Sequence, residues 1–157
     1  LSPQVASYAL ALIGLFNIIG TYLAGSLGQR VLKTHILAFI YFMRAVAIAM
    51  FLYFPLSDTS VYLFAMGMGV LWLSTVPPTS ATVAQIFGVA HLSMLGGFIF
   101  FSHQLGSFMG VWLGGYMYDR FGSYDLVWYL AIALGVFAAT VNLMVREAPI
   151  SRELAHA

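Results

Sequence analysis

The sequence predicts an all-α integral membrane protein with five transmembrane helices. Its composition is the first reason, because 62% of the 157 residues are hydrophobic and only 7% are charged. A soluble domain carries about a quarter charged residues, so this chain has too few to cover a surface that faces water. The charges also cluster, which leaves long uncharged stretches. A net charge of +1 indicates no nucleic-acid partner, and the lack of cysteine excludes disulfide and thiolate chemistry.

Five apolar stretches define the predicted helices, and each is near or above the ~20 residues that cross the hydrocarbon core of a bilayer. They run over 4–27, 34–54, 60–87, 92–118 and 125–145. Turn-forming segments separate them, as PLSDTS does after the second stretch. Continuous apolar spans of this length must satisfy their backbone groups as helices. Residues 1–147 therefore read as one partial transmembrane domain, and the polar residues 148–157 as a tail.

The positive charges of the short loops predict the orientation of the chain. Cytoplasmic loops carry an excess of lysine and arginine. Arg30 and Lys33 lie in the first loop, and Arg146 and Arg152 follow the last helix. The second and fourth loops contain only Arg120, beside acidic residues. We therefore expect a cytoplasmic C-terminus and an N-terminus outside.

A six-residue pattern occurs twice, ninety residues apart: GTYLAG at 20–25 and GVWLGG at 110–115, each near the end of a span. The two copies cross the membrane in opposite directions, as in the inverted three-helix repeats of some secondary transporters. The second unit holds three helices, whereas the first would need another helix upstream of Leu1. Because the chain also lacks a starting methionine, we expect it to be a truncated part of a longer protein.

The chain resembles the C-terminal half of a major facilitator superfamily transporter without the first helix of that half. Members carry the pattern G-x-x-x-D-R-x-G in a loop between paired helices. GYMYDRFG matches it, in the predicted outer loop of the second unit. The matching positions are Gly115, Asp119, Arg120 and Gly122. The cytoplasmic loop that usually carries the pattern keeps only Gly28 and Arg30, so a charge relay at that loop is not expected.

Within the superfamily, segments such as PPTSATVAQIFG and SHQLGSFMGVWLGG are most similar to bacterial monocarboxylate-porter-like and oxalate/formate-antiporter-like members. This resemblance implies a multi-pass protein of the inner (plasma) membrane that moves a small organic solute, with a carboxylate as the candidate. It also implies a partner, the missing N-terminal half of the same transporter. Asn17 and Thr21 stand where monocarboxylate porters keep an aspartate and an arginine, so that site is absent in its usual form.

Arg44 lies about ten residues into the second span, roughly 15 Å deep at the rise of a helix. Placing arginine there costs about 2.5–3.5 kcal/mol on insertion scales. The five carboxylates of the chain all lie in loops or in the tail. Its partner is therefore an anionic substrate, an acidic residue outside this chain, or main-chain carbonyls. The third helix of each unit is peripheral in the resembled fold, which favours a structural clamp over substrate contact.

The polar pair His103 and Gln104 lies near the middle of the fourth span, which lines the cavity in the resembled fold. Adjacent residues are ~100° apart on a helix, so at most one points squarely into a pore. His103 is either a hydrogen-bonded packing residue or a group that exchanges a proton near neutral pH. The candidate residues for substrate binding or coupling are Asn17, Arg44, Trp72, Ser74, Thr75, His103, Gln104 and Ser107.

The same span contains Gly106, Gly110 and Gly114, which recur every four residues. Small residues at this spacing let a neighbouring helix approach closely. The pattern therefore favours helix packing over chemistry.

Two consecutive prolines, Pro77 and Pro78, lie inside the third span. Each removes a backbone donor and frees a carbonyl, so we expect the helix to kink or break here. Nearby hydroxyls such as those of Ser74 and Thr75 can re-satisfy the freed groups. Interrupted segments mark a substrate site or a gate in transporters, and a static kink is the alternative.

The predicted function is solute transport by alternating access, without enzymatic activity, metal or cofactor. Its partners are the lipid bilayer, a small-molecule substrate and the rest of the transporter. The alternative is a non-transporting helical membrane subunit, such as an electron-transfer or assembly module. A haem in such a module needs axial histidines facing each other at depth, whereas His35 and His91 lie at loop edges.

Overall fold

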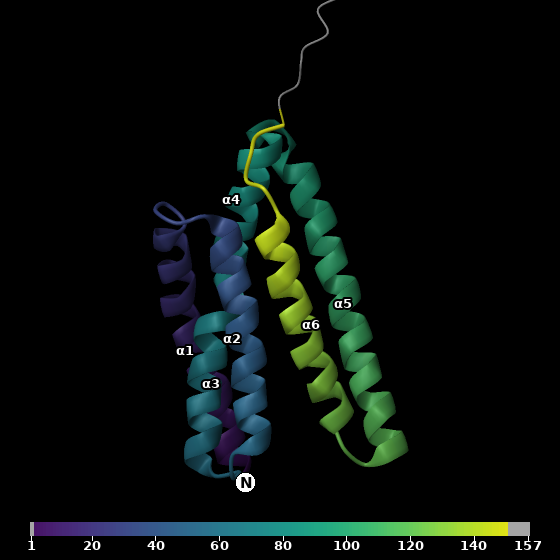
Figure 1. The fold of residues 1–157 in the computed structure, drawn as a ribbon. Helices are drawn as coiled ribbons and strands as arrows, with labels where there is room; N and C mark the ends of the chain where they lie inside the picture. The colour runs from purple at the N-terminus through teal and green to yellow at the C-terminus, as the bar shows by residue number, and fades with distance from the viewer. Residues whose placement is uncertain (1, 151–157) are drawn as a thin grey trace, which may run out of the picture.

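The computed structural model describes residues 2–150, which form helices joined by short connections (Figure 1). Residues 151–157, most of the predicted tail, lie outside the described part. The elements are α1 (Pro3–Leu27), α2 (Lys33–Tyr53), α3 (Asp58–Trp72), η1 (Leu73–Thr75), α4 (Val76–Phe87), η2 (Val89–His91), α5 (Leu92–Phe121) and α6 (Asp125–Met144). The predicted all-α class is confirmed.

Among residues 2–150, four segments are long and apolar enough to cross a membrane, where the sequence predicted five. They are Pro3–Leu27, Lys33–Tyr53, Asp58–Phe87 and Asp125–Met144. The fifth, α5, is a continuous helix of 30 residues but does not reach the same hydropathy. The reason is its content of glycine and polar residues, including the run Ser102, His103 and Gln104. The chain is a multi-pass helical membrane protein in which α5 is the most polar long helix.

Glycines allow the tightest helix contacts in the molecule, which join α1 to α3 and α2 to α6. A Cβ atom on Gly20 of α1 would collide with the backbone of α3. A Cβ atom on Gly69 of α3 would lie 2.8 Å from the carbonyl oxygen of Ile13 in α1. On the other side, a Cβ atom on Gly135 of α6 would lie 3.2 Å from that of Ala45 in α2. Substitution at Gly20 or Gly69 would force the backbones of α1 and α3 apart.

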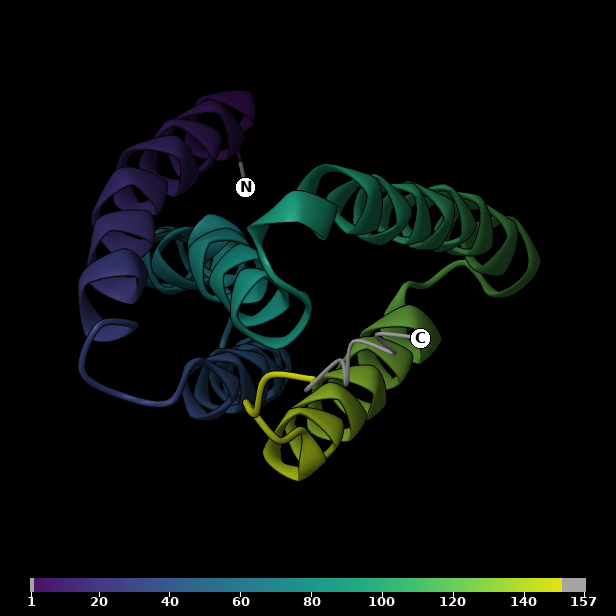
Figure 2. The same cartoon turned by 90° about the horizontal axis from the view of Figure 1, so that it is seen from above.

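The helix α5 is packed far more loosely than α1. Seen from above, α1 and α5 lie on opposite sides of the central α3 and α4 (Figure 2). Among the elements of residues 2–150, α5 contacts mainly α4, η2 and α6. Gly114 is its only buried residue. Most of the side chains of α5 are therefore exposed in the described part of the chain.

The turn between α5 and α6 differs from the predicted loop. The helix continues to Phe121, so Gly115, Asp119 and Arg120 lie inside its last turns and not in an outer loop. Gly122 ends it with a left-handed backbone (φ 68°), and its N–H donates to the carbonyl of Tyr118 at 2.8 Å. Only glycine adopts this conformation without strain, so the helix stops at Gly122 and not at the charges before it.

Candidate functional site

The segment from α3 to α4 is interrupted near its middle. The α-helix α3 ends at Trp72, a short 3-10 turn covers Leu73–Thr75, and α4 begins at Val76 with Pro77 and Pro78 in its first turn. Proline has no N–H, so the carbonyls four residues upstream lose their α-helical donors. The N–H of Val76 donates to Leu73 instead, which tightens the turn. The break therefore lies just ahead of the two prolines, and its use as a gate stays a prediction.

Arg44 reaches this break from α2. Its Nε donates to the carbonyl of Leu71 at 3.1 Å, and Nη2 donates to Leu71 at 2.6 Å and to the carbonyl of Trp72. The guanidinium also lies over the rings of Tyr41 and Trp72, 5.3 and 6.0 Å from their centroids. Of the three partners that the sequence left open, main-chain carbonyls are the ones beside Arg44. Substrate contact by Arg44 stays a prediction.

Asn17 holds the same break from α1. Its Oδ1 accepts the N–H of Leu73 at 3.0 Å. Ser74, which is buried, donates its hydroxyl to the carbonyl of Val70 one turn earlier. Thr75 is half-buried. Two neighbouring helices therefore contact the backbone at the break, Arg44 as a donor to the carbonyls of Leu71 and Trp72 and Asn17 as an acceptor from the N–H of Leu73.

The polar residues of α5 lie apart from this arrangement. His103, Gln104 and Ser107 are exposed, and the hydroxyl of Ser107 donates to the carbonyl of His103 at 2.9 Å within the helix. A Cβ atom on Gly106 or Gly110 would meet nothing within 4 Å, and the same holds for Gly114. Within residues 2–150, the hydrogen bonds to the break from other helices come from α1 and α2. The structure thus brings Asn17, Arg44, Trp72 and Ser74 together and leaves the α5 residues separate.

The charged end of α5 packs along its own helix. Arg120 donates from Nε to the hydroxyl of Tyr116 at 3.4 Å, and its guanidinium lies 6.0 Å from the centre of that ring. Tyr116 in turn stacks on Trp112, with ring centroids 5.8 Å apart. These contacts order the last turns of α5, and they are local to it.

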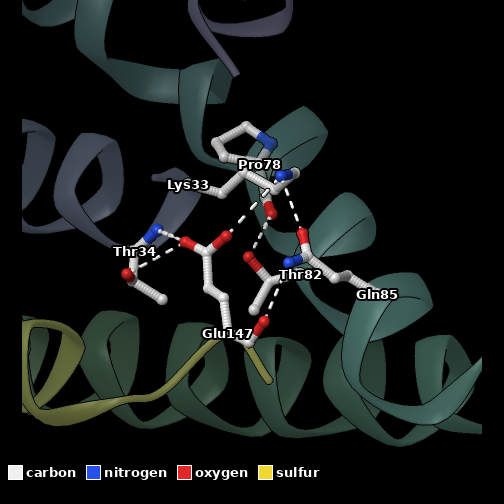
Figure 3. A network of polar contacts seen from close by, with 6 residues as sticks. All are labelled: Lys33, Thr34, Pro78, Thr82, Gln85 and Glu147. Atoms are coloured by element: carbon white, nitrogen blue, oxygen red, sulfur yellow. Dashed lines mark hydrogen bonds and ion pairs between the residues drawn. The ribbon is translucent and has the colours of Figure 1, made fainter. Parts of the chain in front are cut away.

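A second polar cluster, which sequence reasoning missed, is centred on Glu147 (Figure 3). Its Oε1 accepts the backbone N–H of Thr34 at 2.6 Å and the Thr34 hydroxyl at 3.0 Å. The ammonium of Lys33 lies 3.5 Å from Oε2 and donates to Oε1 of Gln85 at 2.8 Å. Gln85 donates in turn to the carbonyl oxygen of Glu147 at 2.8 Å. We call these four residues the Glu147 cluster; it joins the start of α2, the end of α4 and the segment after α6.

The Glu147 carboxylate caps the N-terminal end of α2, although the two are 113 residues apart in the sequence. The residue before α2 is Leu32, whose side chain cannot accept a hydrogen bond from the first turn. Glu147 supplies that acceptor and places a negative charge at the positive end of the helix dipole. Burial of the carboxyl acts to raise its pKa, but the two Thr34 donors and Lys33 outweigh burial, so the pKa of Glu147 lies below its usual range. A helix start with no local cap was the only sequence signal for this contact.

Residues 2–150 contain no group of three histidine, cysteine or acidic side chains placed to hold a metal ion.

Comparison with known proteins gives the following matches. The family model described as Major Facilitator Superfamily matches residues 1–156. The uncharacterized MFS-type transporter YcxA of Bacillus subtilis (strain 168) is 28% identical over 140 residues, which cover 86% of this chain and 34% of that protein. The chain therefore spans about a third of the length of this curated relative. No solved structure matches the chain.

Proposed function

Because the chain belongs to the Major Facilitator Superfamily, we propose that it is part of a secondary transporter that works by alternating access. It forms most of the C-terminal half, and it rocks against an N-terminal half supplied by the rest of the same protein. The match covers 34% of the Bacillus relative, which supports the proposal that this chain is part of a longer protein. The protein lies in the plasma membrane with its C-terminus in the cytoplasm, performs no covalent chemistry and uses no cofactor.

The match of residues 1–156 to the Major Facilitator Superfamily model is the observation that carries this proposal, and the interrupted segment from α3 to α4 is consistent with it. Broken helices at mid-membrane are where transporters bind solutes, because the break leaves backbone groups free to contact them. Here Asn17 and Arg44 occupy the N–H of Leu73 and the carbonyls of Leu71 and Trp72. These bonds favour a fixed bend over a flexible hinge. The bend presents the exposed indole of Trp72 as one wall of the solute path.

The opposite wall is α5, whose His103, Gln104 and Ser107 are exposed in the described chain. The open small-residue series on the same helix leaves room for helices of the other half. The solute is a small organic molecule, with monocarboxylates and dicarboxylates as the candidates. Arg44 acts mainly as a clamp on the bend, since its contacts go to main-chain carbonyls.

The test is uptake and exchange of labelled acetate, lactate, formate and oxalate by the full-length protein in proteoliposomes. Saturable uptake of one of them, with counterflow driven by unlabelled solute, is the expected result. Uptake only of uncharged solutes would overturn the carboxylate assignment and leave transport standing. No transport of any solute, together with a haem or metal absorption spectrum, would instead favour a non-transporting membrane subunit.

A further inference from the structure

The end of the helix α4 is held weakly by the helix itself. The helix starts at the break and stops at Gly88, whose positive φ of 84° takes the backbone out of the helix. Its buried residues are Pro78 and Thr82, and no residue of α4 after Thr82 is buried. The last carbonyls of any helix also lack donors inside it. The end of α4 therefore depends on partners from elsewhere in the chain.

The segment after α6, residues 145–150, supplies those partners, and we call it the strap. The N–H of Ile150 donates to the carbonyl of Ile86 at 3.0 Å. In the opposite direction, the side chain of Gln85 donates to the carbonyl of Glu147 at 2.8 Å (Figure 3). These two bonds lie three residues apart on the strap and on adjacent residues of α4. The strap is therefore fixed against the last turn of α4.

Glu147 joins the strap to α2 as well. Its main-chain carbonyl accepts from α4, while its side chain accepts the N–H and the hydroxyl of Thr34 in α2. The side chain of Glu147 is only 3% exposed, and a buried carboxylate is costly unless donors surround it. Lys33 completes the arrangement by donating from α2 directly to Gln85 of α4. The carboxylate meets its Thr34 donors where the bonds to α4 place the strap.

We propose that the strap couples the start of α2 to the end of α4, so that the two helix ends open and close together. The bonds to α4 place the carboxylate beside Thr34, and the bonds to Thr34 hold the strap against α4. Loss of either set should therefore loosen the other, although within residues 2–150 no hydrogen bond joins Thr34 to α4 itself. The coupling is a property of the folded chain, so it stands or falls separately from the transport proposal.

The test is amide hydrogen exchange of the full-length protein in detergent micelles, measured by mass spectrometry on peptides from the start of α2 and from the last turn of α4. Thr34→Val removes the hydroxyl bond to Glu147 and keeps the shape of the side chain. We expect exchange to become several-fold faster at the start of α2 and, by a similar factor, at the last turn of α4. Exchange at α4 that stays at the parent's rate would show two independent contacts and overturn the proposal.

Two further variants make the result specific to the strap. Thr140→Val on α6 is the matched control, because its hydroxyl bonds within its own helix, to the carbonyl of Val136 at 2.9 Å, and both peptides should exchange as in the parent. Equal acceleration at α4 in Thr140→Val and Thr34→Val would mean general loosening and overturn the proposal. Should Thr34→Val fail to fold, Glu147→Gln decides the outcome, because it keeps the main-chain carbonyl that Gln85 contacts and weakens only the side-chain bonds to α2. Faster exchange at the last turn of α4 in Glu147→Gln supports the coupling, and an unchanged rate there overturns it.

Discussion

The two copies of the repeated glycine pattern have opposite surroundings. Gly20, in the first copy, lies so close to α3 that a Cβ atom would strike its backbone, whereas a Cβ atom on Gly110 in the second copy would meet nothing within 4 Å. The same spacing of small residues thus serves a closed contact in α1 and an open surface in α5. A small-residue pattern therefore predicts that a helix can be approached closely, while the rest of the fold decides whether a partner helix lies there.

The strongest test of this difference is a pair of matched alanine variants. Gly20→Ala should destabilise the protein by about 3 kcal/mol, because the methyl group meets backbone atoms that cannot move aside. Gly110→Ala should change stability by less than about 0.5 kcal/mol, because its methyl group enters open space. Thermal melting and the yield of monodisperse protein in detergent measure both. Equal losses in the two variants would mean that α5 packs as tightly as α1 does.

The stability of the bend between α3 and α4 should depend on Arg44. Arg44→Gln loses the paired donors to the carbonyls of Leu71 and Trp72, and we expect a loss of about 2 kcal/mol in stability and a lower yield of folded protein. Arg44→Lys keeps the charge without the planar fork and should recover only part of the loss. If Arg44→Gln instead leaves melting unchanged and abolishes uptake of anions by the full-length protein, Arg44 is a substrate ligand.

The Glu147 cluster should contribute less to folding stability than Arg44 does, and its contribution should depend on pH. Glu147→Ala removes the cap of α2 and should cost about 1 kcal/mol at neutral pH. The pKa of Glu147 is lower in the folded protein than its ordinary value of 4.5, so its contribution is fully present above about pH 4.5. It is lost as pH falls through the lower folded pKa.

Melting curves between neutral and acidic pH check this prediction. The parent should lose stability on acidification, and the stability of Glu147→Ala should fall less over the same range. Asp119→Asn, at the exposed end of α5, is the matched control and should melt as the parent does. A Glu147→Ala variant with the parent's acid sensitivity would assign that sensitivity to other carboxylates.

The smallest effect on stability is expected at His103, which lies in the loosely packed helix α5. His103→Gln should change melting by less than about 0.5 kcal/mol, since the side chain is exposed. In the full-length protein it should slow uptake, because glutamine keeps the hydrogen-bonding capacity of the side chain but cannot carry a proton. Exchange of labelled for unlabelled solute should survive. Unchanged uptake would make His103 a packing residue.

The helices were predictable because their signals are local. Apolar runs and turn residues placed them, and the prolines at 77 and 78 indicated the break that the structure has at Leu73–Thr75. The end of α5 was placed too early, because Asp119 and Arg120 read as loop although the helix runs on to the left-handed Gly122. Charged residues end a transmembrane span without ending the helix.

The contacts between helices were much less predictable. The carbonyl partners of Arg44 were one of three open alternatives, and the bond from Leu73 to Asn17 joins residues 56 positions apart. Glu147 was expected only to lie outside the spans, because nothing in its own neighbourhood shows that it reaches α2. Such contacts depend on how the helices pack, and periodicity and turn chemistry carry no information on that.

The cap of α2 also has a consequence for biosynthesis. Glu147 and Thr34 are 113 residues apart in the chain, so α2 is made long before its cap. At a synthesis rate of about 5–20 residues per second, roughly 6 to 23 seconds separate the two. Throughout that interval the first turn of α2 lacks the Glu147 acceptor. The emergence of residue 147 from the ribosome then caps a helix made 113 residues earlier, so a nascent chain halted before that point would keep this end of α2 open to quality-control proteases.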